Sequence, residues 1–216
     1  MSKLSFGIKL VDSNDNISQN VLRALLPDIN KYFDKAYEVM KEKIPAILIK
    51  HIKLQPEYDS LLNGALKAEF GLPDSSSRVG SIISAIENSV TIQTKPLSIS
   101  GKQLKGSIKI QMIQKDFSEL LSLGAASFTT EKGSELNWLQ WLLIEGDSVI
   151  IADYSFVLGS FPSSRTGMGI MRQFGGPSWR VPPEFAGSIN SNWITRAIDS
   201  AAADIQNELQ SIERIF

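Results

Sequence analysis

The chain has 216 residues, 43% of them hydrophobic, which is enough for one well-buried core. Its 22 basic and 23 acidic residues are interspersed and leave a net charge of −1, so the chain as a whole has no field that attracts nucleic acid or an anionic membrane. The absence of cysteine excludes a disulfide framework and a thiolate nucleophile, and it fits a reducing compartment. With no signal-peptide pattern and no long apolar segment, we expect one soluble domain over residues 1–216, made in a cytoplasm.

The first half of the chain is predicted to be mostly helical after an initial strand. Residues 3–12 alternate apolar and polar side chains, which is the period of a half-buried strand. A long apolar repeat over residues 22–48 predicts one helix or two in series, and Pro27 and Pro45 inside it predict kinks or breaks. Two further short helices follow, over residues 56–72 and 74–89.

In the middle of the chain the pattern changes to a period of two. Residues 89–95 and 104–112 alternate in this way, and "PLSISGKQL" (residues 96–104) predicts a loop that joins them as an antiparallel pair. The elements expected next are helices over 116–124 and 134–146, a buried strand over 148–159, and a strand over 169–172 that pairs with it.

The last helix has the clearest apolar face. It is expected to begin after residues 188–191, and its apolar stripe consists of Ile194, Ile198, Ala201, Ile205, Leu209 and Ile212. The elements together predict an α+β fold, with a long N-terminal helix and a C-terminal helix packed on a small antiparallel sheet. A long Gly/Pro-rich loop, over about residues 159–190, completes the prediction.

The sequence offers few residues for catalysis. The single histidine, His51, excludes a histidine-dependent triad and a site with several histidine ligands. Glu145, Asp147 and Asp153 form the one oxygen-rich group that would suit Mg²⁺ or Ca²⁺. Ordinary turn chemistry between a helix and a strand explains these carboxylates better. We therefore expect no enzyme activity and no cofactor.

Two other motifs were weighed as binding sites. The Gly-x-Gly of "TGMGIM" lacks the third glycine and the strand–turn–helix context of a phosphate loop. Four lysines make a basic strip, and two of them, Lys105 and Lys109, share the polar face of one strand; the others are Lys102 and Lys115. A solvated strand face is the favoured interpretation, and Lys105 and Lys109 are the candidates for facing DNA.

The segment Ser164–Gly187 concentrates glycine, proline and aromatic residues. Within it, "SWRVPPEF" places Trp179, Arg180 and Phe185 around Pro182 and Pro183, whose fixed φ angles stiffen the chain. Tryptophan and arginine dominate protein–protein hot spots, so these side chains are candidate interface anchors. The alternative is that Trp179 and Phe185 fold back as a satellite of the core, and the sequence leaves both interpretations open.

The motifs "WLLIEGD…IIADY", "SRTGMGIM", "WRVPPEFAG" and "NWITRAI" resemble neck or tail-completion proteins of long-tailed bacteriophages, most specifically over residues 138–198. In that family an aromatic residue, an arginine and a small residue open the last helix, and Trp193, Arg196 and Ala197 occupy those places here. The resemblance implies a small α+β virion protein that assembles into a ring at the head–tail junction.

The resemblance also implies the partners. These are copies of the chain in a ring, a hexamer rather than a dodecamer, other neck, connector or tail proteins, and genomic DNA that passes through the lumen without sequence readout; no membrane is involved. The candidate interface residues are Arg165, Trp179, Arg180, Pro182, Pro183, Phe185, Trp193 and Arg196. The alternatives are a virion-associated hydrolase that uses a metal held by the three carboxylates, and a DNA-binding module.

Overall fold

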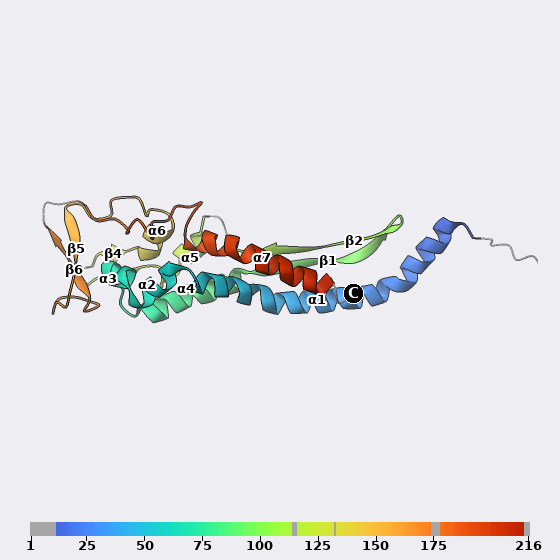
Figure 1. Ribbon diagram of the computed structural model, residues 1–216, viewed down its shortest axis with the longest axis horizontal. Coiled ribbons are helices and arrows are strands. Elements are labelled where there is room, and N and C mark those ends of the chain that lie inside the picture. Colours follow the sequence, from blue (N-terminus) through green and yellow to red (C-terminus); the bar gives the residue numbers. More distant parts are fainter. Residues whose placement is uncertain (1–11, 114–115, 132, 174–177, 214–216) are drawn as a thin grey trace, which may run out of the picture.

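The computed structural model describes residues 12–113, 116–131, 133–173 and 178–213, and its longest element is helix α1 (Asn14–Lys53). Ser13 caps this helix by accepting a hydrogen bond from the Asn16 amide at 3.3 Å. Pro27 and Pro45 lie inside the helix, so the prediction of breaks is wrong. Figure 1 shows that the first part of α1 runs at an angle to the rest, which is the bend an interior proline causes. The predicted strand over residues 3–12 lies, apart from Asp12, outside the described residues.

The three short helices that follow agree closely with the predicted ranges. They are α2 (Pro56–Asn63), α3 (Ala65–Phe70) and α4 (Ser75–Ser89). The first predicted helix is divided at Gly64, where a Cβ atom would lie 2.9 Å from the Ser60 Cα. Helix α3 ends at Gly71, whose φ of +60° is the left-handed conformation that glycine adopts without strain.

Strands β1 (Thr91–Ser100) and β2 (Gln103–Gln111) form the predicted antiparallel hairpin, with Gln93 opposite Lys109. The hairpin is longer than expected, because residues 96–100 extend β1 instead of forming a loop. Its turn lies at Gly101, which has a φ of +64°. The register shifts between Lys95 and Ser98, around Pro96, which has no amide hydrogen to donate to the ladder.

The remaining elements form the head of the molecule and the closing helix. They are α5 (Ser118–Leu121), β3 (Phe128–Thr129), β4 (Glu135–Leu136), α6 (Trp138–Leu143), β5 (Tyr154–Leu158), β6 (Gly169–Gln173) and α7 (Trp193–Glu213). Strands β3 and β4 pair antiparallel, as do β5 and β6. The α+β prediction is confirmed, with three two-stranded sheets among the described residues in place of one small sheet. The strand expected over 148–159 is confined to its second half and is only partly buried.

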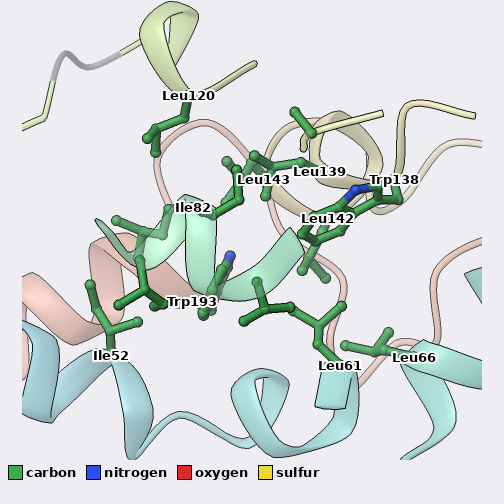
Figure 2. Close-up of a cluster of buried hydrophobic side chains, with 14 of the residues drawn as sticks. Ile52, Leu61, Leu66, Ile82, Leu120, Trp138, Leu139, Leu142, Leu143 and Trp193 are labelled. Atoms are coloured by element: carbon green, nitrogen blue, oxygen red, sulfur yellow. The ribbon is translucent and has the colours of Figure 1, made fainter. Parts of the chain in front are cut away.

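Two hydrophobic clusters correspond to two parts of an elongated molecule. The larger one fills the head, where side chains from α1, α2, α3, α4, α6 and α7 meet (Figure 2). The smaller one, centred on Met40, Ile44 and Ile205, joins α1 to α7 beneath the hairpin. Figure 1 shows α7 lying along α1, while the hairpin and the start of α1 extend away from the head. We call residues 14–39 of α1 and the β1–β2 hairpin the arm.

Asn192 fixes the start of α7. Its side-chain oxygen accepts from the Ile194 and Thr195 amides at 3.0 and 3.1 Å, and its own amide donates to the Thr195 hydroxyl at 2.8 Å. This reciprocal cap lies one residue after the segment that the sequence indicated. The Asn192 side chain is fully buried and donates to the Leu143 and Ser188 carbonyl oxygens. The cap therefore also ties α7 to the end of α6.

The packing of α7 on α1 generates the first prediction. Ile205→Asp places a charge in the smaller cluster, where Ile205 is 8% exposed, and should lower the free energy of unfolding by several kcal/mol. Gln206→Asp, at the neighbouring exposed position, should cost about 0.5 kcal/mol or less. Denaturant unfolding of both variants measures the difference. Equal stability of the two would contradict the assigned face of α7.

Candidate functional site

The segment over residues 159–190 is more structured than the predicted loop. It contains β6, which pairs with β5 as predicted. Further along, the Trp179 amide donates to the Ile151 carbonyl at 2.8 Å, and the Ile150 amide donates to the Trp179 carbonyl at 2.9 Å. Gly175 and Gly176, which were expected to act as hinges, lie outside the described residues. The part that carries Trp179 is thus held against the head.

Trp179 belongs to the core of the head. It is 6% exposed, and its ring packs edge-on against Phe70 and Trp141, with centroids 5.9 and 6.1 Å apart. Its indole nitrogen Nε1 donates a hydrogen bond to Glu69 Oε2 at 2.8 Å. The satellite-core alternative therefore holds for Trp179, and its candidacy as an exposed interface anchor is corrected. Apolar burial of a large ring outweighs its value as a surface contact here.

The Glu69 carboxyl is perturbed by this packing. Its partial burial raises its pKa above the ordinary value, because the charged form loses hydration. The hydrogen bond from Trp179 opposes this effect, and the nearby Glu184 carboxylate adds to it. Glu69 is therefore a half-buried acid whose charge is costly in the folded chain.

The residues after Trp179 alternate between the core and the surface. Val181 is fully buried, so Arg180 is exposed between two buried neighbours. Pro183 is also exposed, whereas Pro182 and Phe185 are half-buried and Phe185 packs against the head cluster. The Phe185 amide donates to the Pro182 carbonyl at 2.8 Å, which closes a turn. The structure thus presents Arg180 and Pro183 on a backbone that is already fixed.

A cavity of 590 Å³ opens on the head between α3, the β3–β4 hairpin and the β5–β6 hairpin. Its lining includes Glu69, Glu131 and Arg165 above an apolar floor that contains Phe156 and Met171. The Arg165 guanidinium lies 5.1 Å from the centre of the Phe128 ring, which is a cation–π contact. Partial desolvation lowers its pKa, and the Glu131 carboxylate opposes that change. A lining with both charge signs and an apolar floor suits recognition of a peptide segment.

Trp193 and Arg196, two other predicted interface residues, stabilise the fold from within. Trp193 is 1% exposed, and its indole nitrogen has no hydrogen-bond acceptor among the described residues. Arg196 forms an ion pair with Glu57, whose side chain is fully buried in α2. Because an uncompensated buried carboxylate is strongly destabilising, Arg196 is needed to neutralise Glu57. Both residues are therefore corrected from interface anchors to scaffold residues.

Close backbone contact joins the quoted motifs to one another. A Cβ atom on Gly146 would lie 2.4 Å from the Gly187 nitrogen, and one on Gly187 would lie 2.2 Å from the Leu142 carbonyl oxygen. The Gly146 amide donates to the Gly187 carbonyl at 3.1 Å. Only glycine permits this approach. Motifs that are separate in the sequence are thus parts of one packed unit.

The three candidate metal ligands do not converge. Glu145 Oε1 accepts a hydrogen bond from the Gln140 side chain at 2.6 Å, and Asp147 is exposed in the turn that follows. Asp153 adopts a left-handed backbone conformation with a φ of +60°. Among the described residues, no group of three or more His, Asp or Glu side chains lies close enough together to hold a metal ion. The turn explanation of these carboxylates is therefore the one that the geometry favours.

The basic strip is arranged as the alternation predicts. Lys105 and Lys109 lie on the outward face of β2, and Lys95 on β1 shares that face. Lys102 forms an ion pair with Asp15 at 2.6 Å, and Lys115 lies outside the described residues. The hairpin sequence from Thr91 to Gln111 contains four lysines and no acidic residue, so its outward face is positive.

Sequence reasoning missed the polar side chains that position the head and α7. His51 bridges α1 to α7, with Nδ1 2.9 Å from the Ser200 hydroxyl and Nε2 3.0 Å from Asp204 Oδ2. Hydrogen bonding to His51, with help from Lys50, lowers the pKa of Asp204. Glu57 and Glu69 were also missed. Each is an acid within a short helix with no pattern to separate it from exposed neighbours, so only its tertiary partner identifies it.

No protein-family model, no curated protein and no solved structure matched this chain. Within the described part of the chain, none of the helices combines the length and the apolar character needed to cross a membrane.

The raised pKa of Glu69 generates a pH-dependent prediction. A raised folded-state pKa stabilises the fold below the unfolded pKa, and this contribution is lost as pH rises through the folded pKa. Glu69→Gln keeps an acceptor for Trp179 and removes the charge, so it should melt higher than the wild type at about pH 7 and equally at about pH 4. Thermal melts at both pH values provide the measurement.

Glu69→Ala serves as the control, because it leaves the Trp179 indole nitrogen without its acceptor. This variant should be less stable than Glu69→Gln at both pH values, by about 1–3 kcal/mol. If Glu69→Gln melts below the wild type by the same amount at both pH values, then loss of the charged hydrogen bond outweighs relief of desolvation.

Proposed function

We propose that the chain is a structural virion protein, a ring-forming subunit of the neck or tail-completion assembly at the head–tail junction of a long-tailed bacteriophage. The observation that carries the proposal is the packing of the motifs that resemble this family. The Gly146–Gly187 contact, the Ile151–Trp179 pairing and the Asn192 cap join them into one unit. A packed set of motifs supports a shared structural role better than separate turns would.

Exposed residues of this unit suit repeated docking between identical subunits. Arg180 stands on a backbone fixed by its buried neighbours, so docking costs it side-chain entropy only. Pro183 adds a rigid apolar contact beside it. A heterologous contact of this kind, repeated around a rotation axis, closes a ring. We propose a hexamer, with other neck, connector or tail proteins as further partners.

The positive face of the hairpin supports a place for DNA in this assembly. Lys95, Lys105 and Lys109 point outward without an ion pair among the described residues. Lysines on a strand face attract phosphates and read no base sequence. We propose that these lysines face the genomic DNA in the lumen of the ring.

Arg180 tests the ring proposal. Arg180→Ala should weaken each subunit contact by about 1–3 kcal/mol, roughly 5- to 150-fold, while leaving monomer melting unchanged. Arg172→Ala is the matched control, because Arg172 is also exposed on the head but its guanidinium lies over the ring of Phe161 in the same chain. Native mass spectrometry and negative-stain microscopy report assembly. A wild-type protein that stays monomeric at all concentrations would refute the proposal.

The lysines generate a separate prediction about DNA. Duplex binding by the assembled protein should fall steeply with salt concentration and should not depend on sequence. Lys105→Glu combined with Lys109→Glu should weaken it and reduce the salt slope by about two phosphate contacts. Fluorescence anisotropy across a potassium chloride series measures both. Unchanged affinity in this variant, with rings intact, would show that the hairpin face does not meet DNA.

A further inference from the structure

Helix α1 carries an apolar stripe that nothing covers in the described part of the chain. The structure exposes eight large hydrophobic side chains, and half of them lie on α1: Val21 at 52%, Leu25 at 47%, Tyr32 at 47% and Val39 at 37%. Leu25, Tyr32 and Val39 are spaced seven residues apart, and Val21 and Val39 are separated by about five turns, so all four lie along one edge of the helix. Exposed apolar side chains scattered singly need no explanation, but an aligned set does. We call these four residues the α1 stripe.

The α1 stripe continues the side of α1 that α7 covers. Lys43 and Lys50 lie on the same side of the helix as Tyr32, about three and five turns further on. They pair with Glu208 and Asp204 of α7, at 2.5 and 3.4 Å. Figure 1 shows that α7 ends well before the start of α1 and before the turn of the hairpin. The α1 stripe is therefore the extension, beyond the end of α7, of a surface that already binds a helix.

The hairpin is also incompletely covered in this region. None of its residues is fully buried, although its inner face carries isoleucine and leucine side chains. Toward the hairpin turn these inner residues include Ile99 and Leu104, which are only half-buried. The arm is thus two layers thick where α7 does not reach, and a third layer would bury both apolar surfaces.

The charges beside the α1 stripe indicate what kind of partner fits. Between Val21 and Val39 the helix carries three basic and three acidic residues: Arg23, Asp28, Lys31, Asp34, Lys35 and Glu38. A balanced set does not favour an anionic membrane or nucleic acid, both of which select positive charge. A seven-residue apolar spacing with mixed charges beside it is typical of helix–helix contact between protein chains.

We propose that the α1 stripe is a subunit interface, and that its occupant is a second copy of this chain, which supplies a helix in line with α7. This inference rests on the proposed ring, and it names the surface through which neighbouring subunits hold one another. The arm extends away from the head, so the contact reaches beyond the subunit's own core.

The experiment compares two double variants of the full chain. Leu25→Ser with Tyr32→Ser removes the centre of the α1 stripe. Lys31→Ser with Asp34→Ser is the matched control, because it introduces the same residue into the same part of α1 on other sides of the helix. Sedimentation velocity over a concentration series measures assembly, and circular dichroism of the dilute monomer measures melting. The stripe variant should need at least about tenfold more protein to assemble, with monomer melting equal to that of the control.

A second measurement does not depend on tolerance of serine. Because the chain has no cysteine, Tyr32→Cys introduces a single thiol. Its reaction with maleimide should be fast in the dilute monomer and slowed in the assembled protein. Equal rates in both states would overturn the inference.

The remaining outcomes separate this inference from the proposed function. Rings formed equally well by the stripe variant and the wild type would overturn the inference and leave the ring in place. A wild type that never assembles would overturn both. If deletion of residues 2–11 lowers monomer melting and exposes the Tyr32→Cys thiol, the stripe is covered by the chain's own N-terminal residues, which also overturns the inference.

Discussion

The contact between the backbones of Gly146 and Gly187 sets the geometry of the whole head. It holds the turn after α6 against the residues that lead into α7, at a separation that leaves no room for a side chain on either glycine. Asn192 then begins α7 five residues later, while its side chain donates to the Leu143 carbonyl at the end of α6. The direction of α7 along α1 follows from these two contacts.

The direction of α7 in turn decides which surfaces are left for partners. Because α7 runs along α1 from the head, it covers the part of α1 around Met40 and Ile44 and leaves the arm exposed. Buried polar groups hold this arrangement, with Arg196 neutralising Glu57 and His51 bridging to Asp204. Such groups add little net stability but penalise other arrangements of the same helices, since each leaves a charge or a donor unpaired.

The functional proposals place different tasks at the two ends of the molecule. The head presents Arg180 and Pro183 on a rigid backbone, which suits specific docking. The arm presents the α1 stripe on one side and the lysine face of the hairpin on the other, which suits contact with a neighbouring subunit and with DNA. An elongated subunit with separate surfaces of this kind fits a ring better than a site enclosed within one chain, because each surface meets a different neighbour.

The sequence by itself determined the elements whose formation depends on local pattern. The period of two over residues 89–95 and 104–112 predicted the hairpin and the shared face of Lys105 and Lys109, and the apolar stripe from Ile194 predicted α7. Tertiary structure decided what local pattern does not encode. Packing held α1 together through Pro27 and Pro45, and neighbours distant in the sequence buried Trp179 against Phe70 and Trp141. Trp179 and Arg180 are adjacent and were equal candidates for an interface. Only the fold separates them, because strand-like alternation sends one side chain into the core and the next into solvent, and the direction of each depends on what packs against the segment.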